Sequence, residues 1–184
     1  VACRRRIKVD SLHVPWPAIE IRRQIYDLFY PFTQQLGQSI VSGLAAQSPR
    51  KVYLSRSKLD TGNRWLAGEP AVENIMTDLG FVIAHPESMG FPEQIALLQD
   101  CETICGFAGS AFHTLLFARP NKRTLYLVPE AVINANLHMI DKARGDHSTF
   151  GFVDVRIEKT PDGKRVAHIK DGKALEAAVR SLDI

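Results

Sequence analysis

Hydrophobic residues in this chain gather in short runs between residues 51 and 128, and polar segments that contain Gly or Pro separate these runs. Apolar runs of this length are typical of buried parallel strands. Segments 70–79 and 91–98 between them are predicted to be helices, with Pro70 in the first turn of one helix and Gly80 as its stop. Strands that alternate with short helices predict parallel pairing through right-handed crossovers. The strands are predicted at residues 51–55, 81–84, 103–105 and 124–128, which makes a doubly wound, mainly parallel, Rossmann-like α/β sheet.

The residues on either side of this core predict further helices and one hairpin. Apolar residues recur at mostly helical spacing over residues 18–29, and a second helix is predicted over 32–44, after an interruption at Pro31. On the carboxyl side, the alternating segments 152–157 and 164–169 indicate a β-hairpin. Helices are also predicted over 131–144, with Gly145 as the stop, and over 173–182. Residues 56–68 are predicted to be a polar, basic loop. The predicted organisation is an N-terminal linker with helices (1–50), a Rossmann-like core (51–130) and a C-terminal helix, hairpin and helix that pack on the core (131–184).

The composition is that of an ordinary globular domain, with 45% apolar and 23% charged residues in a chain of 184. The net charge of +3 comes from basic residues spread along the chain, so we expect no nucleic-acid partner. Three cysteines give no disulfide framework, which favours a reducing compartment. No apolar run approaches ~18 residues and no signal peptide is visible, so we expect no membrane span. Because the chain begins with Val1 rather than Met, we expect it to be a fragment of a longer protein.

The segment 101–120 has the pattern of a strand, a tight glycine turn and the start of a helix. Gly106 and Gly109 follow the predicted strand, and Ser110 opens an apolar run that ends at Pro120. The free N–H groups in the first turn of such a helix bind phosphate or carboxylate, and glycines let a ligand approach the backbone. The alternative is a buried strand, turn and helix in which the glycines serve packing alone.

Three loops are expected at the carboxyl ends of the predicted strands. Arg56, Arg64 and Glu69 follow the first strand, and two arginines can clamp a diphosphate because guanidinium groups bind phosphate oxygens bidentately. The alternative for this loop is a solvent-exposed basic segment. Glu93 starts a helix after the second strand, where it either contacts a ligand or complements the helix dipole. His113 lies one helical turn beyond Gly109 and is either a ligand contact or a hydrogen-bonded core residue.

Neither a metal nor a bound cofactor is expected. The histidines show no ligand-type spacing and no Asp-x-Asp pair is present. The chain also lacks a Walker-type phosphate loop, a Gly-x-Gly-x-x-Gly fingerprint and a nucleophile elbow. These absences argue against a phosphate-hydrolysing loop protein, a dehydrogenase and an α/β-hydrolase.

The order of these motifs resembles glycosyltransferase family 61, which is also catalogued as a domain of unknown function associated with capsular polysaccharide biosynthesis. The resemblance implies a GT-B-type architecture, of which this chain is the carboxyl-terminal, donor-binding half. It implies inverting transfer of a sugar from a nucleotide-sugar to a hydroxyl acceptor such as a saccharide, without a bound metal, in the bacterial cytoplasm. The missing N-terminal domain of the same protein is then a partner. The matching positions, between Lys51 and Pro129, are Val52, Tyr53, Leu54, Ser55, Arg56, Arg64, Glu69, Gly80, Phe81, Glu93, Gln94, Ile95, Gly106, Gly109, Ser110, Leu116 and Phe117.

The resemblance also assigns roles to residues. Arg56 and Arg64 neutralise the diphosphate leaving group, which is an electrostatic task. The donor-binding set adds Glu93 for the ribose hydroxyls or the sugar, Gly106, Gly109 and Ser110 for a phosphate at the helix start, and His113 for a phosphate or a sugar hydroxyl. Glu69 is the one candidate general base.

The sequence departs from the family pattern at three places. Ala108 and Thr114 stand where the family usually carries His and Asn, and Gly68 precedes Glu69 where the family usually has Asn. These changes put the donor, and activity itself, in question. Two further readings therefore stay open, a non-catalytic nucleotide- or nucleotide-sugar-binding domain derived from a transferase half, and an interaction domain without a small ligand.

Overall fold

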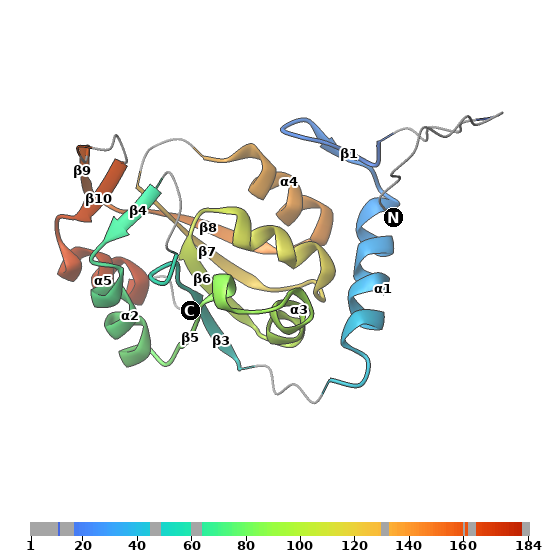
Figure 1. Cartoon of the computed structure of the whole chain (residues 1–184), viewed down its shortest axis with the longest axis horizontal. Helices are drawn as coiled ribbons and strands as arrows, with labels where there is room; N and C mark the ends of the chain where they lie inside the picture. The colour runs from blue at the N-terminus through green and yellow to red at the C-terminus, as the bar shows by residue number, and fades with distance from the viewer. Residues whose placement is uncertain are drawn as a thin grey trace.

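The centre of the molecule is a five-stranded sheet in which all neighbouring strands are parallel (Figure 1). The computed structural model describes residues 11, 17–44, 49–59, 64–129, 133–159, 161 and 165–181. The order of the strands across the sheet is β5-β3-β6-β7-β8. The prediction of a mainly parallel, Rossmann-like α/β sheet is confirmed. The strands are β3 (Lys51–Leu54), β5 (Val82–Ala84), β6 (Thr103–Phe107), β7 (Arg123–Val128) and β8 (His147–Phe152).

Helices cover both faces of this sheet because alternate residues of each strand point to opposite sides. In β3, Val52 and Leu54 belong to one hydrophobic core and Tyr53 to the other. The core around Tyr53 is completed by α2 (Glu69–Asp78) and α5 (Gly172–Ser181). The other is completed by α1 (Phe29–Val41), α3 (Phe91–Gln99), α4 (Ala135–Arg144) and the 3₁₀ helix η2 (Ser110–Phe117), and a short 3₁₀ turn η1 (Pro86–Ser88) precedes α3.

The strand order fixes where a ligand is expected. Along the chain, β3 is followed by β5 on one side of it, whereas β6, β7 and β8 are added on the other side. The order therefore reverses between β3 and β6, and ligands of open α/β sheets bind beyond the carboxyl ends of the strands at such a switch point. The segments that leave β3 and β6 begin at Ser55 and Ala108.

A second, smaller sheet has three strands. It consists of β4 (Arg64–Ala67), β9 (Val155–Lys159) and β10 (Arg165–Ile169), with β10 parallel to β4 and antiparallel to β9. The predicted C-terminal hairpin is thus confirmed as β9 and β10, although Phe152 belongs to β8. The prediction of a loop over residues 56–68 is wrong for residues 64–67, which form β4. This strand gains its hydrogen bonds from β10, about a hundred residues further along the chain, so local sequence carries no sign of it.

The N-terminal region differs from the prediction. Where a helix was predicted over 18–29, residues 19–25 form a short antiparallel hairpin of β1 (Ile19–Glu20) and β2 (Gln24–Ile25). Arg22 turns the chain with a φ of 62°, a conformation that a helix does not contain. The helix α1 then starts at Phe29 and includes Pro31, which fits in a first turn because its missing N–H has no intrahelical acceptor there.

The remaining helices lie close to their predicted positions. Gly80 and Gly145 follow α2 and α4 with φ values of 80° and 69°, as expected for glycines that stop helices. The helix predicted over 131–144 starts at Ala135, and the helix after Gly109 is 3₁₀ rather than α. Among the described residues, no helix combines the length and the apolar character that a bilayer crossing needs.

Candidate functional site

Arg56 and Gly109 meet at the switch point of the sheet. Arg56 follows β3, and its guanidinium lies over the ring of Phe107, 5.7 Å from the centroid, at the end of β6. A Cβ atom placed on Gly109 would lie 3.6 Å from Nη1 of Arg56. The turn after β6 therefore passes beside the guanidinium, and glycine keeps that side of it free of a side chain.

Arg56 forms no ion pair with a carboxylate among the described residues. Within the described part of the chain, no carboxylate oxygen lies within 4.0 Å of the guanidinium nitrogens. Its Nε is buried and has no hydrogen-bond partner among the residues that the structure describes. Buried donors are nearly always paired, and an unpaired one costs free energy. An anionic oxygen is the acceptor that best satisfies a guanidinium.

Glu69 supports the backbone of Arg56 from the first residue of α2. Its side chain is buried, with 1% of the residue exposed, and Oε1 accepts hydrogen bonds from the Arg56 N–H at 3.0 Å and from the Tyr53 hydroxyl at 3.2 Å. Burial raises the pKa of Glu69, and the Arg56 N–H and the Arg56 charge partly offset this rise. This geometry favours a positioning role for Glu69, and its role as a general base stays a prediction.

The raised pKa of Glu69 leads to a test by pH. Because burial penalises the ionised form in the folded state, Glu69 contributes stability below its unfolded pKa, near 4.5, and that contribution is lost as the pH rises through the higher folded pKa. Glu69→Gln keeps an acceptor oxygen for Arg56 and Tyr53 but does not titrate. We expect the stability of the variant relative to the parent to increase with pH above about 4.5. Urea unfolding between pH 4 and 7 measures this difference, and a constant difference across the range would contradict it.

Gly109 and Ser110 begin η2 as predicted, whereas Gly106 lies within β6. The first hydrogen bond of η2 runs from the Phe112 N–H to the Gly109 carbonyl at 3.3 Å, so the N–H of Ser110 precedes the intrahelical bonds. A Cβ on Gly106 would lie 2.8 Å from the Leu54 carbonyl oxygen. Gly106 thus allows β3 and β6 to pair closely, and its donor-binding role stays a prediction.

Glu93 and His113 occupy separate positions around this turn. The Glu93 carboxylate accepts a hydrogen bond from the Gly90 N–H at 2.7 Å and so caps its own helix, α3. His113 is an exposed residue of η2, but neighbouring atoms shield part of its ring from water, and this desolvation lowers its pKa. Thr114 and Ala108 are two of the three positions that depart from the family pattern. The hydroxyl of Thr114 donates to Oε1 of Gln94 at 3.3 Å, whereas Ala108 donates its N–H to the Leu127 carbonyl at 2.9 Å. The donor-binding roles of Glu93 and His113 stay predictions.

Arg64 is the first residue of β4 and pairs with Arg165 of β10. Its side chain lies outside the described part of the structure. The clamp of a diphosphate between Arg56 and Arg64 therefore stays a prediction.

A cluster of polar side chains that the sequence reasoning missed lies between α2 and the residues on either side of Arg56. Glu73 on α2 accepts hydrogen bonds at Oε1 from the hydroxyls of Ser55 at 2.6 Å and Ser57 at 2.5 Å, and Nδ1 of His85 lies 4.0 Å from the same oxygen. Burial works against ionisation of Glu73, but these hydroxyls together with the charges of His85 and Lys58 lower its pKa. Two signals could have found the cluster, the spacing of Glu73 four residues after Glu69 on one helix and the serines on both sides of Arg56.

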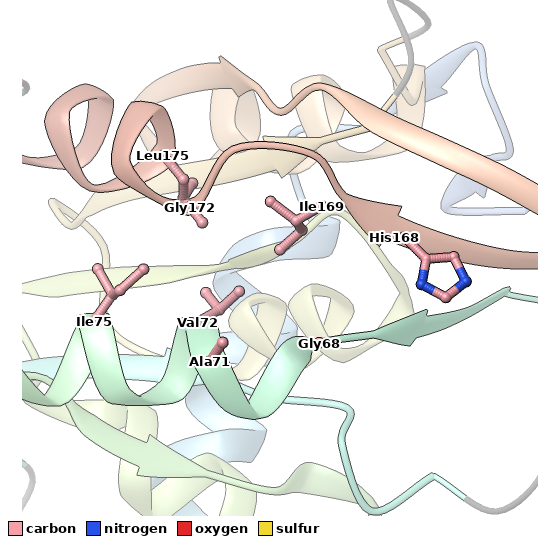
Figure 2. Close-up of a pocket in the computed structure, with 8 residues that line it drawn as sticks. All are labelled: Gly68, Ala71, Val72, Ile75, His168, Ile169, Gly172 and Leu175. Carbon is pink, nitrogen blue, oxygen red and sulfur yellow. The ribbon is translucent and has the colours of Figure 1, made fainter.

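An apolar hollow of about 300 Å³ lies apart from this cluster (Figure 2). Ala71, Val72 and Ile75 of α2 point toward Ile169 and Leu175 from the end of β10 and from α5. Val72 and Leu175 also belong to the core that α2 and α5 complete, so the hollow is where these elements meet. Among the described residues, no three His, Cys, Asp or Glu side chains are grouped so that they could hold a metal ion.

Comparison with known proteins gives one match. The family model described as Glycosyltransferase 61 matches residues 3–125, which include Arg56, Glu69, Glu73 and the glycine turn. No curated protein and no solved structure matched the chain.

Proposed function

This chain belongs to glycosyltransferase family 61, and we propose that it is the donor-binding half of a GT-B-type, inverting glycosyltransferase. The proposed reaction moves a sugar from a nucleotide-sugar to a hydroxyl acceptor in polysaccharide biosynthesis, in the cytoplasm. The observation that supports it most directly is Arg56. Its guanidinium lies at the switch point of the sheet, beside the glycine turn, and forms no ion pair within 4.0 Å with a described carboxylate.

In the proposed mechanism, Arg56 binds the diphosphate of the donor. The acceptor oxygen forms a bond to the anomeric carbon as the bond from that carbon to the diphosphate oxygen breaks, and the acceptor proton passes to a base. Negative charge develops on the departing diphosphate, so a fixed guanidinium lowers the barrier without a metal ion. Arg64 is the proposed second cation, and the N–H groups of Gly109 and Ser110 bind a phosphate oxygen at the start of η2.

The described residues do not include a carboxylate that is well placed to be the general base of the proposed reaction. Glu69 already accepts two hydrogen bonds and is almost fully buried, so it is poorly placed to reach an acceptor hydroxyl. In a GT-B arrangement a second domain brings the acceptor and can supply the base. We therefore propose that Glu69 positions Arg56 and that proton removal is carried out from the acceptor side.

A second candidate function is binding of a nucleotide or nucleotide-sugar without turnover. The observations that favour it are Ala108 and Thr114, because the Thr114 hydroxyl is engaged with Gln94 and Ala108 has no polar side chain. The two functions share the donor site and differ only in turnover. Release of free nucleotide from the sugar conjugate, measured with an acceptor mixture, separates them.

The proposed donor site is tested by nucleotide binding to variants. UDP, GDP, CMP and their sugar conjugates are added to the parent, Arg56→Ala and Arg64→Ala, and the melting temperature is recorded. A nucleotide at 100 times its dissociation constant adds about 2.7 kcal/mol of stability. We therefore expect one of these nucleotides to raise the melting temperature of the parent but not that of Arg56→Ala or Arg64→Ala.

Arg50→Ala is the matched control for this experiment. Arg50 directly precedes β3, at the opposite end of the strand from Arg56, and its side chain is 82% exposed in an ion pair with Glu102. The control should respond to the nucleotide as the parent does. The proposed function is contradicted if no nucleotide stabilises the parent, or if Arg56→Ala responds like Arg50→Ala.

A further inference from the structure

Two carboxylates on one face of α2 hold the three residues that follow β3. Oε1 of Glu69 accepts from the Arg56 N–H at 3.0 Å, and Oε1 of Glu73 accepts from the hydroxyls of Ser55 at 2.6 Å and Ser57 at 2.5 Å. The Ser57 N–H also donates to the Ser55 hydroxyl oxygen at 3.1 Å, so the serines are joined to each other as well as to Glu73. Glu69 and Glu73 are four residues apart, which places them on the same side of the helix.

The arrangement fixes the backbone on both sides of Arg56 without using its side chain. The guanidinium points away toward Phe107 and Gly109, whereas the charge of Glu73 is satisfied by neutral hydroxyl groups. Hydrogen bonds to an ionised acceptor are roughly twice as strong as those between neutral groups. A loop held in this way presents Arg56 in one orientation before any ligand arrives, which reduces the ordering cost of binding.

His85 makes no hydrogen bond to Glu73, unlike Ser55 and Ser57. Its Nδ1 lies 4.0 Å from the Glu73 oxygen, which is longer than a hydrogen bond. The side chains of His85 and Glu73 are only 17% and 20% exposed, so His85 closes the cluster on the β5 side. The contact that can fix the loop is therefore the one from Glu73 to the two hydroxyls.

We propose that Glu73 is a positioning residue for donor binding, which acts through the hydroxyls of Ser55 and Ser57 to hold Arg56 where it meets the donor diphosphate. This inference rests on the proposed function and assigns the second carboxylate of α2 to the same site. Glu73 itself does not touch the donor. Its loss should weaken nucleotide binding as the freed loop lets Arg56 move away from the switch point.

The test compares Glu73→Ala, Ser57→Ala and the double variant with the parent. The measured quantities are the dissociation constant of whichever of UDP, GDP or CMP stabilises the parent and the melting temperature without nucleotide. We expect Glu73→Ala to bind about tenfold more weakly, and the double variant to bind no more weakly than Glu73→Ala. Ser57→Ala changes only a loop hydroxyl, so it tests the same contact with the fold intact should Glu73→Ala prove unstable.

Two further variants separate positioning from a general loss of stability. Glu73→Gln keeps the length and one acceptor oxygen, and should recover most of the affinity that Glu73→Ala loses. Asn74→Ala changes the next, exposed residue of α2 and should bind as the parent does. Affinity that follows the melting temperature across all variants, without recovery in Glu73→Gln, would overturn the proposal.

The outcomes also distinguish this inference from the proposed function. If the parent binds a nucleotide and Arg56→Ala does not, but Glu73→Ala and Ser57→Ala both bind as tightly as the parent, only the positioning role is overturned. Additive losses in the double variant overturn it as well, because residues that act through one contact are not additive. If the parent binds none of the nucleotides, the proposed function fails and the positioning role fails with it.

Discussion

Replacement of Gly37 by Ala should lower the free energy of unfolding by about 3 kcal/mol, although Ala is the better helix former. Gly37 is buried in α1, and a Cβ atom at this position would lie 1.9 Å from the carbonyl oxygen of Phe117 and 2.7 Å from its carbonyl carbon. Both are backbone atoms at the end of η2, so no flexible side chain can move aside. The clash therefore has to push the helix and η2 apart.

The face of α1 that carries Gly37 has further contacts that would be lost. The hydroxyl of Tyr30 donates to the Ala118 carbonyl at 3.0 Å, and the hydroxyl of Thr33 donates to the Leu116 carbonyl at 2.8 Å. Separation of α1 from η2 breaks these bonds and leaves buried groups unpaired. This loss, with the overpacking, exceeds the gain of about 1 kcal/mol from helix propensity.

Chemical denaturation followed by circular dichroism measures this effect. Gln35→Ala is the control, because Gln35 is exposed on the same helix and the substitution also introduces Ala. The control should stay within about 0.5 kcal/mol of the parent. A Gly37→Ala variant that is as stable as the control would mean that α1 does not rest on η2 as described.

The central sheet could be predicted because burial on both faces leaves a strong mark in the sequence. Val52 and Tyr53 are neighbours in β3, face opposite cores and are both fully buried, so the strand needs a continuous apolar run. The strand β8 was missed because it lacks burial on both faces and so leaves no such mark in the sequence. It pairs with β7 alone in the sheet, and its residues His147, Ser148 and Thr149 make no apolar run.

The N-terminal error shows the limit of helical spacing as a signal. Over residues 18–29 the apolar residues do not share one buried face, since Ile21 is 75% exposed whereas Ile25 and Phe29 pack against the core. The turn at Arg22 lets the two isoleucines diverge. The hairpin is closed by the Tyr26 N–H on the Ala18 carbonyl, a contact that apolar spacing does not report.

The candidate site could be predicted in part. Arg56 and Gly109 follow strands that were recognised, and parallel strands end at one edge of a sheet, so their proximity follows from the topology. The contacts of Glu73 depend instead on how α2 crosses β3, since its partners Ser55 and Ser57 lie 18 and 16 residues away. The residue type and its place after a strand made Arg56 a candidate. Only the folded chain shows that the carboxylates of Glu69 and Glu73 hold the backbone and the serines around Arg56.

Replacement of Arg144 by Met should lower the free energy of unfolding by about 3 to 5 kcal/mol, because it leaves a buried carboxylate and several carbonyls without their partner. The guanidinium donates from Nε to Oδ2 of Asp146 at 2.6 Å, and both side chains are 0% exposed. The other two nitrogens donate to the carbonyls of Leu115, Ala118 at 2.9 Å and Arg119 at 2.8 Å. Arg144 thus ties the last turn of α4 to the carboxyl end of η2, the helix whose other end forms the glycine turn beside Arg56.

The cost of the Arg144 variant should come mainly from the unpaired charge of Asp146. Asp146 also accepts the Lys122 N–H at 3.1 Å, a contact that Asn can keep. We therefore expect Arg144→Met with Asp146→Asn to be more stable than Arg144→Met alone, as urea unfolding will show. Lys142→Met, in the same last turn but exposed, should cost less than about 0.5 kcal/mol. If the double variant is instead less stable by the sum of the single losses, the unpaired carboxylate is not the cause, and the hydrogen bonds from Arg144 to the carbonyls at the end of η2 carry the stability of this corner.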